Sequence, residues 1–191
     1  TLDLKERAWH ATTSNDRSIG VEIANIGAYS AHEKNPFAQW YQTNADGKVY
    51  NIIPKRMGNY GGIRTTNFVG HPARNEPVRG TIQGEDLVQY DYTPEQYAAL
   101  TKLTAALCKI FPKLQCRYPV DASGKLIPHK LPDEELKNYE GVLGHYHIQT
   151  NKTDPGPALD WERLVGGAQK LLGQGKSPAT LTPRAQSPVH G

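Results

Sequence analysis

The stretch 144–157 constrains this chain more than any other part of its sequence. It brings two histidines, a lysine and an aspartate close together along the backbone and then stops regular structure with Pro-Gly-Pro. The residues just before it, 141–148, predict a short strand. Alternate side chains of a strand share a face, so His145 and His147 should point one way and Tyr146 the other.

Lys152 and Asp154 follow in the same stretch. Asp154 precedes a proline, which favours an extended backbone, so the two side chains are predicted to lie on one side. Neutral imidazoles and carboxylates are good zinc ligands, and a lysine ammonium suits a developing oxyanion. These residue types indicate a metallohydrolase. They also leave an ordinary alternative open, in which the histidines occupy core or surface positions and Lys-x-Asp forms a solvated turn.

Three further pieces of sequence give this pattern a family context. Trp-His-Ala stands at 9–11, Asn-x-x-Ser-Ile-Gly-Val-Glu-Ile at 15–23, and Gly-His at 144–145, followed by Lys-Thr-Asp-Pro-Gly-Pro at 152–157. In this order the pieces resemble the zinc-dependent N-acetylmuramoyl-L-alanine amidases of type 2, the family that includes the peptidoglycan recognition proteins. The resemblance covers roughly residues 5–27 and 85–168. It implies an α/β fold with a mixed central β-sheet packed by helices.

The resemblance also implies roles for four residues. His145 matches the family's second zinc-binding histidine, and Asp154 matches the third ligand. Lys152 matches the lysine that stabilises the tetrahedral intermediate, and Glu22 matches the general base. The residues by themselves are equally consistent with another role for Glu22, in which it caps a strand or pairs with an arginine.

The family's first zinc-binding histidine lies in an opening strand upstream of the Trp-His-Ala loop. This sequence begins after that point, so we expect the opening strand and the first zinc ligand to be missing. His147 or His10 could stand in for that ligand, although the geometry of a metal site is demanding. Trp9, His10 and His147 are otherwise expected to line the substrate site.

The function implied by the resemblance is hydrolysis of peptidoglycan at the amide between N-acetylmuramic acid and L-alanine, with Zn²⁺ as cofactor. The alternative is a non-catalytic peptidoglycan-binding module or an inactive fragment of such an amidase. A cell-envelope or secreted location is favoured. We expect a monomer that acts on peptidoglycan or a muramyl peptide.

Charge and hydropathy exclude other classes of protein. The net charge of +3 is small and unclustered, which argues against nucleic-acid binding. No run approaches the about 18 apolar residues of a membrane span. Cys108 and Cys116 do not form a C-x-x-C pair, so zinc binding by them is not expected, and a disulfide between them stays open.

The remaining sequence predicts one domain over residues 1–172. Residues 18–26 alternate as a strand would, with Ile19, Val21 and Ile23 on one face and Glu22 on the other. Residues 29–84 read as a loop-rich insertion with one strand near 48–53. Thr93-Pro-Glu-Gln is a helix start with a capping box, and the helix should run to about Ile110 before Pro112.

Two shorter helices are expected after it, one near 133–139 and one near 161–172. The composition of residues 173–191 is dominated by Gly, Pro, Ser and Gln, so this segment is expected to be a disordered tail.

Overall fold

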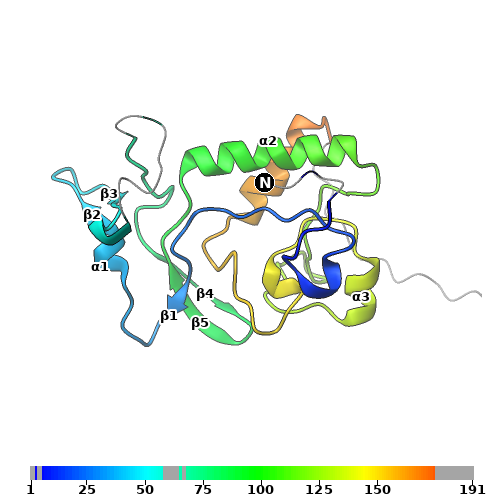
Figure 1. Cartoon of the computed structure of the whole chain (residues 1–191), viewed down its shortest axis with the longest axis horizontal. Helices are drawn as coiled ribbons and strands as arrows, with labels where there is room; N and C mark the ends of the chain where they lie inside the picture. Colours follow the sequence, from blue (N-terminus) through cyan, green and yellow to red (C-terminus); the bar gives the residue numbers. More distant parts are fainter. Residues whose placement is uncertain (1–2, 4–5, 58–64, 66–67, 175–191) are drawn as a thin grey trace, which may run out of the picture.

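The computed structural model describes residue 3, residues 6–57, residue 65 and residues 68–174. The predicted tail at 173–191 therefore lies almost entirely outside the described residues. Helices and small antiparallel sheets surround a core between the long helix α2 and the C-terminal helical segment (Figure 1). Among the described helices, none has the length and apolar character that crossing a membrane requires.

Helix α2 (Pro94–Ile110) is the longest element, and its start confirms the sequence prediction. The Thr93 hydroxyl accepts from the Gln96 backbone N–H, and the Gln96 side chain accepts from the Thr93 N–H, which completes the capping box. The rings of Tyr92 and Tyr97 lie 6.1 Å apart, edge to face, across the start of this helix. Leu103 of this helix is 41% exposed, whereas Tyr97, Thr104 and Ala105 are buried.

The strands form two small sheets rather than one central mixed sheet. Strands β1 (Tyr29–Ser30), β5 (Glu85–Gln89) and β4 (Val78–Ile82) make a three-stranded sheet in that order, and β2 (Tyr41–Thr43) pairs with β3 (Val49–Asn51). Every pairing between these described strands is antiparallel. Strand β3 confirms the strand predicted near 48–53. The combination of helices with strands agrees with the predicted α/β class.

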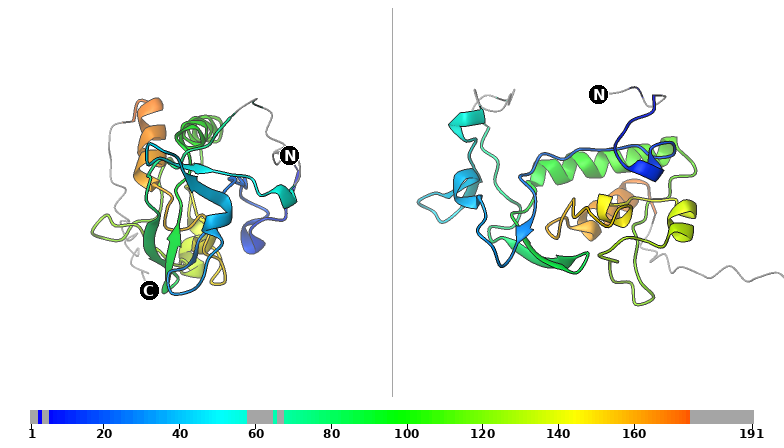
Figure 2. Two further views of the ribbon diagram at one scale, coloured as in Figure 1. Left: turned by 90° about the vertical axis from the view of Figure 1, so that its left-hand side faces the viewer. Right: turned by 60° about the horizontal axis from the view of Figure 1, so that its bottom comes forward.

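The segment 29–84 contains more regular structure than its composition indicates. Besides four of the strands, it holds helix α1 (Phe37–Trp40) and the 3₁₀ helix η2 (Lys55–Met57). The β2–β3 pair and α1 lie to one side of the main body, while the hairpin β4–β5 lies under the C-terminal loops (Figures 1 and 2). That the segment is an insertion stays a prediction.

Residues 18–26 do not form the predicted strand. Their backbone is extended, but it pairs with no other strand in the described part of the chain, and Val21 is 45% exposed. Apolar alternation favours an extended backbone, whereas a strand also needs a neighbour for its ladder of hydrogen bonds. The segment is instead held at its end by Gln96, whose side-chain N–H donates to the Ala24 carbonyl at 2.6 Å.

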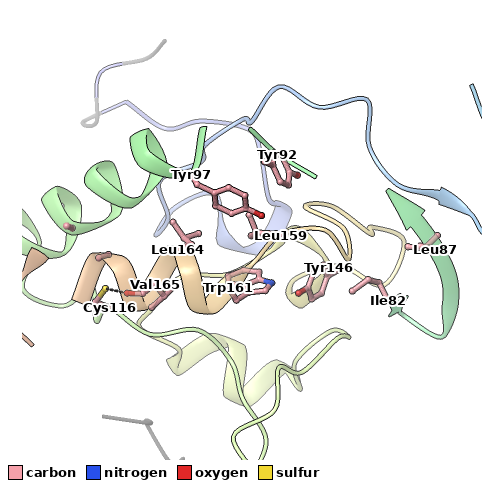
Figure 3. Packing of buried hydrophobic residues seen from close by; sticks show 12 residues of the cluster. Ile82, Leu87, Tyr92, Tyr97, Cys116, Tyr146, Leu159, Trp161, Leu164 and Val165 are labelled. Carbon is pink, nitrogen blue, oxygen red and sulfur yellow. Dashed lines mark hydrogen bonds between the residues drawn. The ribbon is translucent and has the colours of Figure 1, made fainter. Parts of the chain in front are cut away.

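The main core lies between α2 and the C-terminal segment (Figure 3). Trp161, Leu164, Val165 and Ala168 supply its C-terminal side from the π-helical turn η5 (Glu162–Gly166) and helix α4 (Gly167–Leu171). The Asp160 carboxylate accepts from the Arg163 N–H at 2.9 Å at the start of this helical segment. Leu171, near the end of the helix predicted at 161–172, is 59% exposed.

The rest of the fold connects these layers. Helix α3 (Asp133–Asn138) confirms the short helix predicted near 133–139. The 3₁₀ helix η1 (Thr12–Ser14) is held against it by Arg17, whose guanidinium donates to the Tyr139 carbonyl at 2.9 Å. Cys108 and Cys116 are both free thiols, and Cys108 is only partly buried.

Candidate active site

His145 and Asp154 face each other across the turn that joins them. The imidazole Nδ1 of His145 lies 3.1 Å from a carboxylate oxygen of Asp154, and Nε2 lies 2.6 Å from the Gln149 side-chain oxygen. The His145 side chain is 20% exposed and that of Asp154 64%. The Tyr146 N–H also donates to the Asp154 carbonyl at 3.2 Å, so backbone and side chains both hold the two segments together.

The backbone at His145 is not the predicted strand. Residues His145–His147 form the 3₁₀ helix η4, closed by the His147 N–H donating to the Gly144 carbonyl at 3.0 Å. Successive side chains of a 3₁₀ helix diverge by about 120°, so the two histidines do not share a face. His145 borders solvent, whereas His147 enters the core.

His147 is fully buried, and both of its ring nitrogens are bonded. Nδ1 accepts from the Gly144 N–H at 2.9 Å, and Nε2 donates to the Ile127 carbonyl at 2.8 Å. Burial lowers the pKa of His147 to about 4, so the ring is neutral at neutral pH. This environment leaves no lone pair for a metal ion and does not support His147 as a lining residue of the substrate site.

A cavity of about 890 Å³ brings the distant site residues together. Glu22 from the extended segment, His10 from the N-terminal loop, and His145 and Asp154 all line it. Within the described chain, the Glu22 side chain makes no hydrogen bond or ion pair and is exposed. Glu22 is therefore an exposed acidic residue at the border of the cavity that the His145–Asp154 pair also lines.

The walls of this cavity are largely apolar. Leu100, Leu107 and Phe111 contribute from α2, and Leu159 and Trp161 from the C-terminal segment. Tyr92 lies among them, and burial raises its pKa to about 12, so its hydroxyl remains a neutral donor. A ligand in this cavity would therefore meet apolar surface together with charged side chains, among them Glu22 and Asp154.

His10 supports the segment that carries Glu22. Its Nε2 lies 2.9 Å from the Ser18 hydroxyl, and its backbone N–H donates to Asn15 at 3.0 Å. A Cβ added at Gly20 would come within 2.7 Å of the His10 ring, so a glycine is required where the segment crosses it. Trp9 instead projects into solvent, 80% exposed, with the Arg7 guanidinium 4.1 Å from its ring centroid.

The structure does not bring Lys152 to the wall of this cavity. Its side chain is partly buried, and it is not among the residues that line the cavity with Asp154. The role of Lys152 in stabilising an oxyanion therefore stays a prediction.

The His145–Asp154 pair fits two positions of a zinc site. With Zn–N and Zn–O distances of about 2.0–2.2 Å, two ligand atoms of a tetrahedral zinc lie about 3.3 Å apart. The observed spacing of 3.1 Å is close to this value. Catalytic zinc takes three protein ligands, however, and no cluster of three His, Cys, Asp or Glu side chains occurs among the described residues.

Comparison with known protein families shows to which family this chain belongs. The model of the N-acetylmuramoyl-L-alanine amidases matches residues 1–157. The chain belongs to this family. Comparison with curated proteins and with solved structures found no significant match. Membership of this amidase family supports peptidoglycan amidase activity in general.

Some residues of this amidase site were not foreseen from sequence. Gln149 contacts the His145 ring, and Gln89 and Tyr92 hold the loop that carries Asp154. A glutamine has no periodic signature, and the partners of Gln89 are backbone groups of Pro155 and Ala158, distant in the chain.

Proposed function

We propose that this chain is a zinc-dependent peptidoglycan hydrolase that cleaves the amide between N-acetylmuramic acid and L-alanine, acting as a monomer. The observation that carries the proposal is the single cavity lined by Glu22, His145 and Asp154, which come from two ends of the sequence. Family membership supports the same reaction class. An amide at this place would be accessible to a carboxylate and to a histidine–carboxylate pair at once.

Glu22 is the proposed general base. Its carboxylate faces the cavity without a partner in the described chain, so it is free to accept a proton from a water molecule. The water oxygen then bonds to the lactyl carbonyl carbon, and the amide C–N bond breaks as the nitrogen of L-alanine receives a proton. Lys152, as an ammonium, is proposed to meet the charge that develops on the carbonyl oxygen.

His145 and Asp154 are proposed to hold zinc, which when bound would supply Lewis-acid polarisation of the carbonyl. Gln149 and the carboxylate of Asp154 orient the His145 ring now, through contacts at both ring nitrogens. Orienting contacts of this kind are usual for metal-binding histidines.

Product analysis tests the proposed bond. Purified peptidoglycan digested with the zinc-supplemented protein should gain free N-terminal L-alanine and no new reducing sugar ends. Glu22→Gln is the matched inactive variant. New reducing ends would identify a glycosidase, and a different new N-terminus would identify a peptidase; either result would overturn the proposal.

A second candidate is a peptidoglycan-binding module without catalysis. The observation that favours it is that the described residues place only His145 and Asp154 together, whereas catalytic zinc requires three protein ligands. Co-sedimentation with insoluble peptidoglycan separates the two candidates. The binding module predicts sedimentation with no release of L-alanine termini at any zinc concentration, and with no dependence on Glu22.

A further inference from the structure

The loop that carries Asp154 rests on a buried glutamine of the β4–β5 hairpin. Gln89 ends strand β5 and is 1% exposed. Its side-chain N–H donates to the Pro155 carbonyl at 3.0 Å, and its side-chain oxygen accepts from the Ala158 N–H at 3.0 Å. One amide thus satisfies backbone groups on both sides of Gly156, which is the arrangement expected of a group that fixes a loop.

Neighbouring groups pack closely around this side-chain amide. A Cβ added at Gly156 would lie 2.2 Å from the Gln89 side-chain oxygen, and a Cβ at Gly80 in β4 would lie 2.8 Å from Pro157. Tyr92 adds a second donor, since its hydroxyl bonds the Pro155 carbonyl at 2.8 Å. The loop is therefore held by the hairpin and the start of α2 together.

The other end of the same hairpin holds the turn that carries His145. Gln83 sits at the tip of the hairpin, with a φ of 55°. Its side-chain N–H donates to the Tyr146 carbonyl at 2.8 Å and to the Gln149 carbonyl at 2.9 Å. One carbonyl inside η4 and one just after it are thus bonded to a single side chain.

Gln89 also reaches the segment that carries Glu22. Its side-chain N–H lies 3.4 Å from the Asn25 side-chain oxygen, and the Asn25 amide donates to the Tyr90 carbonyl at 3.2 Å. The segments that carry Glu22, His145 and Asp154 are therefore all tied to one hairpin, two of them through Gln89.

We propose that Gln89 is a positioning residue, which together with Gln83 sets the spacing of His145 and Asp154 through the β4–β5 hairpin. The catalytic part of this inference rests on the proposed function. The effect of Gln89 on the backbone beside Asp154 does not. Neither glutamine touches substrate or metal. Each acts through backbone carbonyls beside a site residue.

Amide hydrogen exchange measured by NMR on the metal-free chain tests the structural part. Gln89→Met keeps side-chain length and removes all three hydrogen bonds. The diagnostic probe is the Tyr146 N–H, which donates to the Asp154 carbonyl but not to Gln89. We expect its exchange to accelerate at least tenfold, while amides inside α2 change less than twofold.

The matched control is Gln169→Met in α4, which also removes a glutamine-to-carbonyl bond, in this case to Cys116 at 2.8 Å. It should leave the Tyr146 exchange rate unchanged. An unaltered Tyr146 rate in Gln89→Met, or an equal acceleration at Tyr146 and in α2, would overturn the proposal. If Gln89→Met does not fold, Tyr92→Phe removes the other bond to Pro155 and must accelerate the same probe.

Zinc affinity, measured by competition with a chromogenic chelator, tests the link to function. Loss of an outer-shell partner typically weakens metal binding about 10–100-fold, and this loss is expected for Gln89→Met but not for Gln169→Met. If the wild-type chain neither binds zinc nor releases L-alanine termini, the proposed function fails while the exchange result still decides the positioning role. Full wild-type affinity in Gln89→Met would overturn its role at the metal.

Discussion

The Nδ1 atom of His145 and the Oδ2 atom of Asp154 lie 3.1 Å apart, although nine positions separate the two residues in sequence. This distance suits a hydrogen bond with a proton between the atoms. It is also within a few tenths of an ångström of the spacing that two ligands of one tetrahedral zinc require. Replacing the proton by a metal ion would therefore need little movement of either side chain.

Zinc binding should depend on this pair. With two described ligands, we expect the chain to hold zinc weakly, and His145→Ala should reduce the affinity at least tenfold in chelator competition. His129→Ala, at an exposed histidine outside the cavity, is the control and should bind as wild type does. Tight stoichiometric binding that survives His145→Ala would show that other residues hold the metal.

Glu22→Gln should lower kcat by about 10²–10⁴-fold, the usual contribution of a positioned general base, with zinc content unchanged. Glu140→Gln is a suitable control, because Glu140 lines the same cavity without a proposed role. The measurement is release of L-alanine termini from a soluble muramyl peptide. Loss of zinc from Glu22→Gln would instead identify Glu22 as a ligand.

Lys152→Ala should lower kcat by about 10²–10³-fold and change KM little, because the charge it meets exists mainly in the transition state. Lys125→Ala, in the exposed turn after Gly124, should stay within about twofold. Rates should be compared at equal zinc content. A near-wild-type kcat for Lys152→Ala would remove the lysine from the proposed mechanism.

The buried His147 should make the fold acid-sensitive. Its pKa is about 4 in the folded chain and about 6.5 when exposed, so the unfolded state binds the extra proton between these values. Stability from this group is complete above about pH 6.5 and is lost as pH falls towards 4. The free energy of unfolding in urea should drop by about 2 kcal/mol between pH 7 and pH 5. His147→Phe should lack this part of the pH dependence of the unfolding free energy.

Gly156→Ala should destabilise the fold more than Gly47→Ala does. Both glycines have positive φ, 83° and 76°, so both substitutions strain the backbone by about 1–2 kcal/mol. Only at Gly156 does the new Cβ also meet a neighbour, the Gln89 side-chain oxygen at 2.2 Å. Thermal unfolding of the two variants measures the difference. Equal shifts in Tm would show that the Gln89 contact is not tight.

The sequence by itself determined the local structure wherever neighbouring residues decide it. The capping box at Thr93 and Gln96 depends on side chains three positions apart, and it occurs as predicted. Family membership followed from the order of short motifs, each of which needs only its own residue types. The proximity of His145 and Asp154 was likewise implied by a motif.

Tertiary structure decided what depends on distant partners. Residues 18–26 alternate like a strand, but a strand exists only where a neighbour supplies its hydrogen bonds, and the described chain offers none. His145 and His147 look equivalent in sequence, yet the turn at Gly144 sends one to the cavity and the other into the core. Gln89 carries no local signal at all, because its importance comes from backbone groups of Pro155 and Ala158, which only the folded chain brings to it.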